Sequence, residues 1–285
     1  MTTRMTIAIL IAIAGGGMFA QTRHGMDGWN ITYTTPAGWQ TVQQQGRVAV
    51  FTSAAHPGAY LLVGAGRYSG DEQILADLAT VGQSLNLVQA SPVEPPHTVT
   101  MGGDRALVAG YAGTTRSGQQ VRSHFISRYS GHRTNLNVLA LGTPAQMEGL
   151  RDAAERVAGS MAASEPTVNR QLMTALQGRW TYYDAGSSSS IAGSGSWSRS
   201  YQETVWLDGQ GQFRFESNGH VSIDGATTAG GYSSGASDFS GNRDAGMWTA
   251  IGNTLIFEGR GGIVAVDVVL QGGRLIAGNR TWIRE

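Results

Sequence analysis

The sequence predicts two domains of different class, an α+β domain followed by a small all-β up-and-down barrel. The first half alternates strand-like runs with two amphipathic segments of helical spacing, which favours an antiparallel sheet flanked by helices. Beyond residue 168 the helical periodicity never lasts more than about ten residues. Gly contributes 41 of the 285 residues and charged residues only 14%, a composition typical of turn-rich β structure.

A signal peptide is predicted at residues 1–20. Arg4 supplies a positive charge, Met5–Ala14 is a short apolar run, and Ala20 offers a small residue for cleavage before Gln21. The apolar run is shorter than the roughly 20 residues that cross a bilayer. We therefore expect export to the bacterial periplasm or the outside of the cell, with no stable membrane span after cleavage. The alternatives are a membrane anchor and a buried N-terminal helix.

Charge and cysteine content exclude several classes of partner and site. The chain has 20 basic residues, every one of them Arg, against 20 acidic residues, and it has no Cys. Disulfides and thiolate metal sites are therefore absent. Neither half carries the excess of positive charge that nucleic acid or an anionic membrane attracts, so we expect no nucleic-acid partner.

The first domain is expected at residues 27–163. Its strand-like runs, rich in β-formers and bounded by Gly, Pro or Ser, are Trp29–Tyr33, Val48–Phe51, Tyr60–Val63, Thr98–Met101, Arg105–Tyr111, Val121–Tyr129 and Thr134–Leu141. A Pro-rich bend is expected over residues 92–96.

Two helices are expected among these strands. Ser69 and Glu72 form a capping box, and after them apolar residues fall on one face from Ile74 to Leu85. The second helix begins at a Thr143 cap with Pro144 in its first turn, and it carries apolar residues at steps of three and four.

One family resemblance follows from these elements. The opening Tyr33-x-x-Pro36-x-Gly38-Trp39, the mid-chain helix, the run of hairpins and the closing helix resemble the PsbP-like fold. That family includes extrinsic photosystem II proteins and exported bacterial relatives. The resemblance implies an α/β/α sandwich and, as in most relatives, protein binding or an unassigned role rather than catalysis, and it assigns no functional residue.

Two candidate sites in the first domain have ordinary structural alternatives. The stretch Gly64–Gly70 mimics a dinucleotide-binding loop, but acidic residues at the following helix start disfavour a pyrophosphate there. Arg122, His124 and Arg128 share one face of a predicted strand and form a possible anion patch. The alternative, which we favour, is the solvated face of an antiparallel sheet.

The second domain is expected at residues 171–285, after a linker at 164–170. Its strand candidates are Trp180–Asp184, Ser198–Leu207, Gln212–Ser217, His220–Asp224, Gly246–Ile251, Thr254–Glu258, Ile263–Leu270 and Arg274–Ile283. Roughly eight strands at hairpin spacing suit a closed or nearly closed barrel.

A second resemblance concerns the start of this barrel. The turn Leu172–Leu176 followed by Gly178-x-Trp180 resembles the entry of lipocalin-like domains. The resemblance implies that the turn plugs one barrel end and that Trp180 closes it against Arg280 or Arg284. A cation–π contact would explain such a pair.

Two Gly/Ser-rich stretches, Gly186–Ser196 and Gly225–Gly241, interrupt the predicted barrel. The first expectation for both is a flexible loop. The alternative is a mobile lid over a barrel mouth, where a ligand would contact an aromatic set. That set comprises Trp197, Tyr232, Phe239 and Trp248.

Three hypotheses for function remain open, and the sequence shows no catalytic constellation, metal-ligand spacing or cofactor motif. The first is an exported, non-enzymatic binding protein whose barrel holds a small apolar or amphipathic ligand. The second is an envelope module with a solid barrel that binds a protein partner. The third is an enzyme with a site between the two domains.

Overall fold

The computed structural model describes residues 21–68, 70–84, 87–189, 196–227 and 231–285, so the predicted signal peptide lies outside it. The chain divides into two compact units, Met1–Val168 and Asn169–Glu285. Most of the described residues are in β-strands, with three α-helices among them.

The first unit is built on a seven-stranded antiparallel sheet of order β3-β4-β5-β9-β8-β7-β6. In chain order its strands are β3 (Trp39–Gln45), β4 (Val48–Ser53), β5 (His56–Arg67), β6 (Leu87–Met101), β7 (Asp104–Thr115), β8 (Gln120–Tyr129) and β9 (Thr134–Gly142). A smaller sheet joins β1 (Thr22–Met26), β2 (Ile31–Thr35) and β10 (Ala162–Ala163).

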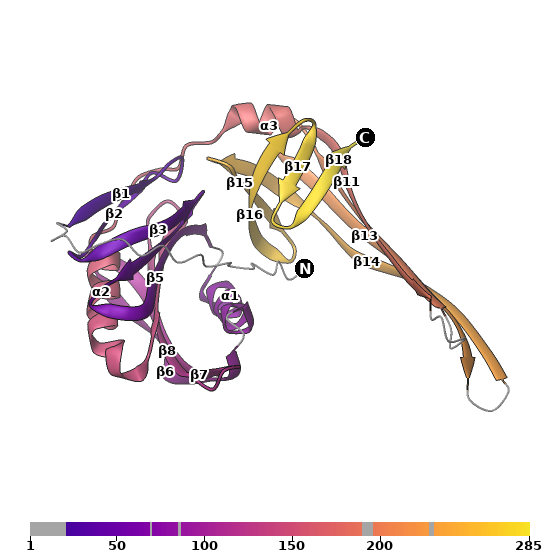
Figure 1. The fold of residues 1–285 in the computed structure, drawn as a ribbon. Helices are drawn as coiled ribbons and strands as arrows, with labels where there is room; N and C mark the ends of the chain where they lie inside the picture. The colour runs from indigo at the N-terminus through magenta and orange to yellow at the C-terminus, as the bar shows by residue number, and fades with distance from the viewer. Residues whose placement is uncertain (1–20, 69, 85–86, 190–195, 228–230) are drawn as a thin grey trace. The chain divides into compact units, whose positions relative to one another are not determined.

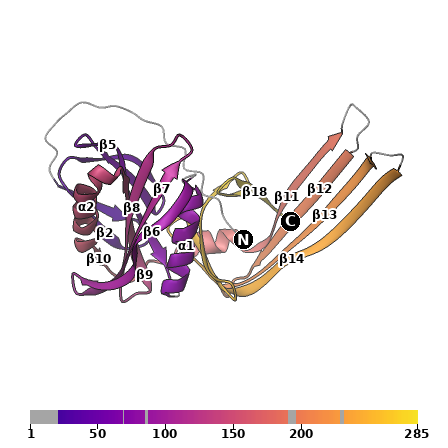
Figure 2. The same ribbon diagram turned by 90° about the horizontal axis from the view of Figure 1, so that it is seen from below.

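Two helices cover opposite faces of the large sheet (Figures 1 and 2). α1 (Asp71–Ser84) packs Ile74 and Leu78 in a cluster that includes Phe125 of β8. α2 (Met147–Gly159), preceded by a short 3₁₀ turn, contacts β8 and β9 and has buried side chains on one face. Side chains alternate along a strand, so the core has one apolar layer on each side of the sheet.

The predicted antiparallel sheet with helices holds in outline, and several strand predictions need correction. β1, β3 and β10 were not expected. The predicted Pro-rich bend lies inside β6, whose pairing with β7 shifts register between Pro92 and Glu94 and between Glu94 and His97. β6 is an edge strand, and an edge accepts Pro because half of its backbone N–H groups need no partner.

The second unit begins with α3 (Arg170–Leu176) and continues as a closed barrel. Each strand pairs antiparallel with the next, and β18 pairs with β11 to close the ring. The strands are β11 (Gly178–Ser189), β12 (Ser196–Leu207), β13 (Gln212–Thr227), β14 (Gly231–Ile251), β15 (Thr254–Gly259), β16 (Gly262–Gln271), β17 (Arg274–Ala277) and β18 (Arg280–Arg284).

The number of barrel strands agrees with the sequence prediction only because two errors compensate. The two strands expected between Gln212 and Asp224 are one strand, β13, with a register shift between Glu216 and Asn218. The single strand expected over residues 274–283 is the hairpin β17–β18, which turns at Gly278 with a φ of 62°.

Four barrel strands continue beyond the barrel as a ribbon, β11-β12-β13-β14, which we call the extension (Figure 2). β11 pairs with β18 only at Trp180 and Thr181, and β14 pairs with β15 only from Gly246 onward. Pairing within the ribbon continues to Ser189↔Ser196 and Thr227↔Gly231. Most of the second Gly/Ser-rich stretch and the described residues of the first, 186–189 and 196, therefore form strand. The loop prediction was wrong for these residues because neighbouring strands extend the ladder despite weak β-propensity.

Candidate functional site: the plugged barrel and its extension

α3 is fastened to the barrel wall by Asn169. Its side-chain Oδ1 accepts from Leu172 N at 3.0 Å and caps the helix, while its Nδ2 donates to Gly252 O at 2.8 Å. The backbone N of Asn169 donates to Ala250 O at 2.8 Å. A capped helix start and two bonds to the β14–β15 hairpin hold this short helix in place.

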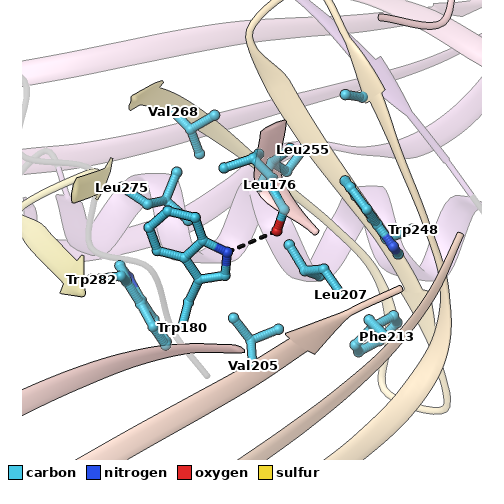
Figure 3. Packing of buried hydrophobic residues seen from close by; sticks show 11 residues of the cluster. Leu176, Trp180, Val205, Leu207, Phe213, Trp248, Leu255, Val268, Leu275 and Trp282 are labelled. Atoms are coloured by element: carbon cyan, nitrogen blue, oxygen red, sulfur yellow. Dashed lines mark hydrogen bonds between the residues drawn. The ribbon is translucent and has the colours of Figure 1, made fainter. Parts of the chain in front are cut away.

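Trp180 closes the end of the barrel that α3 plugs (Figure 3). Its side chain is 1% exposed, and Nε1–H donates to Leu176 O at 2.8 Å. The Arg284 guanidinium carbon lies 5.7 Å from the centre of the Trp180 ring, within cation–π range, and Arg284 Nη2 donates to Gln177 O. Gly178, at a φ of 125°, leaves room for this guanidinium, because a Cβ there would lie 3.3 Å from Arg284 Nε.

The barrel interior next to the plug is filled by its own side chains (Figure 3). Three indoles, from Trp180, Trp248 and Trp282, pack there with Leu176 of α3. The other buried members of the cluster are Val205, Leu207, Phe213, Ala250, Leu255, Val268 and Leu275. An eight-stranded barrel either is filled by side chains or holds one small ligand; here the buried side chains of this cluster form a packed core.

A buried ion pair lies toward the extension. Glu203, on the inward-facing register of β12 with Val205 and Leu207, is 1% exposed and pairs with Arg280 of β18. Tyr201 Oη donates to Glu203 Oε1 at 2.7 Å, and the Arg280 guanidinium carbon lies 5.1 Å from the Tyr182 ring centre. Burial, and then the bond to Glu203, raises the pKa of Tyr201. Arg280 therefore has a role separate from that of Arg284.

The predicted ligand-contacting aromatic residues do not converge. Trp248 belongs to the buried core, whereas Tyr232 pairs with Ala226 near the far end of the extension. The two lie 16 residues apart on one strand, roughly 50 Å when extended. Trp197 and Phe239 are also on extension strands, and the side chains of Trp197, Tyr232 and Phe239 lie outside the described ones. The grouping of Trp248 with the other three residues was therefore wrong, and the lid itself stays a prediction.

The predicted anion patch in the first unit is also wrong, because α2 covers that face of β8. Arg128 is buried, and it donates to Ala158 O and Gly159 O at the end of α2 at 2.8 and 2.9 Å. Its other bonds reach Gly102 O and the Asp104 carboxylate. His124 is buried too, and only Arg122 is exposed.

His124 belongs to a charged cluster that three strands assemble in register. Glu94 pairs with Gly110, and Gly110 with His124. A Cβ at Gly110 would lie 2.8 Å from Glu94 Cβ, so the missing side chain allows Glu94 Oε2 to reach His124 Nδ1 at 3.1 Å. From α2, Arg151 Nη2 lies 3.2 Å from Glu94 Oε2 and Glu155 Oε1 lies 3.9 Å from His124 Nε2. A carboxylate only accepts, so Nδ1 carries the proton and faces Glu94.

We expect acid to destabilise the protein through His124. Burial lowers the pKa of His124 from 6.5, although Glu94 opposes the shift. The unfolded chain then binds more protons between the two pKa values, so stability is complete above about pH 6.5 and falls as the pH drops toward the folded pKa. Urea unfolding should show this fall, with a slope of at most about 1.4 kcal/mol per pH unit from this group.

The His124→Gln variant should flatten that slope while leaving the stability near pH 7.5 less affected, since Gln still donates to Glu94. Burial also lowers the pKa of His24, so part of the fall should remain. An unchanged slope in the variant would contradict the assignment to His124.

The start of α1 carries charge of the wrong sign for a dinucleotide. The Asp71 carboxylate accepts from Tyr129 Oη at 2.6 Å and pairs with Arg105. Burial acts to raise the pKa of Asp71, but these two partners outweigh it and lower that pKa. Ser69, the predicted cap, lies outside the described residues. The described residues hold no group of three or more His, Asp or Glu placed to bind a metal.

None of the helices in the described ranges is long and apolar enough to cross a membrane.

Comparisons with known proteins give only distant similarities. No family model matches the chain, and no curated protein matches it. The solved structures that resemble it include cyanobacterial PsbP (CyanoP) from Synechocystis sp. PCC 6803, at 14% identity and a TM-score of 0.40 over 54% of this chain and 99% of that one. LpqN of Mycobacterium tuberculosis, described as involved in cell envelope biogenesis, has 17% identity and a TM-score of 0.36 over 47% and 83%.

A protein of Bacteroides thetaiotaomicron has 14% identity and a TM-score of 0.37 over 50% of this chain. This chain spans about half of that protein, 48% of its length.

Proposed function

We propose that this protein is an exported, non-enzymatic binding protein of the bacterial envelope that acts through a protein partner. The packed interior of the second unit carries this proposal. Where a ligand-holding barrel keeps a cavity of several hundred Å³, this barrel places Trp180, Trp248 and Trp282 against Leu176 of its plug.

The buried indoles argue against a ligand-holding barrel, and the titratable clusters argue against an enzyme. A small apolar ligand would have to displace buried indoles, each of which contributes a large hydrophobic free energy. The titratable clusters around His124 and Glu203 each lie within one unit, and their groups pair with one another. The outer surface of the barrel, in contrast, exposes Tyr183 and Ile283, and exposed apolar side chains are what a partner surface uses.

A cavity-opening variant tests this proposal. We expect wild-type protein purified from its own cells to show no bound small molecule by native mass spectrometry and no affinity for indole. Trp248→Ala removes a buried indole and should create an apolar cavity that binds indole, as engineered cavities of this kind do. The control is Trp206→Ala, which removes a half-buried indole flanked by Arg179 and Arg214. Wild-type protein that binds indole or retains an apolar molecule would contradict a solid barrel.

A further inference from the structure

Resting on the proposed function, we propose that the free edge of β11 binds an extended segment of the partner protein by strand addition. Between Tyr182 and Ser189, β11 has a strand partner on one side only, β12, within the described part of the chain. A strand edge presents a row of backbone donors and acceptors that an extended chain satisfies. The chemistry of the edge therefore selects an extended peptide over a folded surface.

The position of β18 shows where such a segment would enter. β18 pairs with β11 only through Arg284 and Ile283, so the described part of β11 has no ladder partner on that side from Tyr182 onward, although Trp282 and Arg280 of β18 still contact the Tyr182 ring. Arg280, further back along β18, turns instead to Glu203 inside the barrel. An added strand would continue the sheet from the point where β18 leaves.

Two exposed apolar side chains flank this entry on the outer face of the barrel. Tyr183 is 58% exposed and Ile283, which pairs with Thr181, is 52% exposed. Strand addition gains affinity from main-chain bonds and specificity from contacts with alternate side chains. The occupant should therefore be an extended segment with an apolar residue at every second position on the outward face.

The edge also lacks the features by which proteins block unwanted pairing. All seven Pro residues precede the second unit, and the chain has no Lys, although Pro and Lys are the usual guards of an exposed edge. The first unit shows the contrast, because its edge strand β6 contains Pro92, Pro95 and Pro96. The only charged side chain on the free part of β11, Asp184, pairs with Arg199 of β12 at 3.4 Å.

The other edge of the extension, on β14, also lacks a second strand partner from Gly231 to Ala245 among the described residues, but it is covered at its base. Asp244 of β14 accepts from Arg260 N at 2.9 Å and lies against Gly259, where the β15–β16 hairpin turns. Among the described residues, no backbone N–H of a neighbouring hairpin bonds to Tyr183 on β11 as Arg260 N does to Asp244. The Tyr183 hydroxyl bonds with the side chains of Glu285 and Gln202. The β11 edge is therefore the one that we assign.

The experiment begins with the full-length protein carrying a photo-cross-linking residue at position 183, expressed in its own cells. A matched control carries the same residue at Val269, which is equally exposed on β16. The cross-linked segment of the captured protein is then synthesised as a peptide. Its binding to the purified protein should slow exchange at least about tenfold for those amides of residues 182–189 that face the free edge, because these amides gain hydrogen-bond partners.

Proline variants separate edge pairing from other contacts. Successive N–H groups of a strand point to opposite sides, so of Ala185→Pro and Gly186→Pro one removes an N–H from the free edge and the other a bond to β12. The variant that unfolds at the same denaturant concentration as wild type is the one that has lost an N–H from the free edge. It should bind the peptide roughly tenfold or more weakly. Equal affinity in that variant, protection of β14 instead of β11, or cross-links only to a second copy of this chain would each overturn strand addition at this edge.

The same experiment distinguishes this proposal from the proposed function. If position 183 captures a protein, but the derived peptide binds the proline variants as tightly as wild type, a protein partner is supported and strand addition at this edge is rejected. Absence of any captured protein, together with a co-purifying small molecule, would reject the proposed function as well.

Discussion

Trp180→Ala is expected to lower the free energy of unfolding of the second unit by about 3–5 kcal/mol, as truncation of a buried Trp does in other cores. Three losses combine in this variant. The indole leaves a cavity among Leu176, Trp282 and their neighbours, Leu176 O loses its donor, and Arg284 loses the ring beneath it. Denaturant unfolding followed by circular dichroism measures the change.

Two further variants identify the cause of that loss. Trp180→Phe keeps most of the apolar volume but not the Nε1–H bond to Leu176 O, and should lose about 1–3 kcal/mol. Trp206→Ala, which removes an indole that is only half-buried between Arg179 and Arg214, should cost about 1 kcal/mol. Equal costs for Trp180→Ala and Trp206→Ala would contradict a barrel closed by Trp180.

Arg128→Ala is expected to destabilise the first unit by about 3–5 kcal/mol, the usual cost of removing one partner from a buried charged network. The buried guanidinium bonds at once to the end of α2 and to the β6–β7 turn, through Ala158, Gly159, Gly102 and Asp104. Truncation removes the guanidinium donors from three carbonyl groups and the Asp104 carboxylate, although Ala158 O keeps its bond from Met161 N. Arg128→Lys should recover little, because one ammonium group cannot replace a planar fork with several donors.

Arg122→Ala is the matched control for Arg128→Ala. It removes the same residue type from the same face of β8, but from an exposed position, and should change the free energy of unfolding by no more than about 0.5 kcal/mol. Thermal and urea unfolding of the three variants measure the differences. If Arg122→Ala proved as costly as Arg128→Ala, burial under α2 would not explain the role of Arg128.

The sequence predicted the structure where residues near one another in the chain determine it. Apolar spacing located α2, and the resemblance carried by the turn before Trp180 suggested a contact of Trp180 with Arg280 or Arg284, of which Arg284 lies over the ring. Local pattern failed to predict the burial of Arg128. A strand face with charged residues can be exposed to solvent or covered by a helix, and here α2, which is distant in the sequence, covers it. Local pattern also missed Glu203, although a lone acid in phase with Val205 and Leu207 is the signal that such an inward charge leaves.

The extension was missed for a different reason. Residues such as Gly225 and Ser233 have little preference for strand, so their composition favours a loop. Their pairing, Gly225↔Ser233, continues a hairpin ladder that begins in the barrel at Gln212↔Met247, and the composition of the stretch does not reveal this ladder. Register between neighbouring strands, rather than propensity, sets the length of the ribbon.

The closure of the barrel has a consequence for the order of folding. The other strand pairs are hairpins between neighbours, which form early because their loops are short. The closing pairs Trp180↔Arg284 and Thr181↔Ile283 join segments about a hundred residues apart and bear the largest loop-closure entropy. The core around Trp180 therefore cannot assemble until β18 has been synthesised, so closure of the barrel is the last step in its folding.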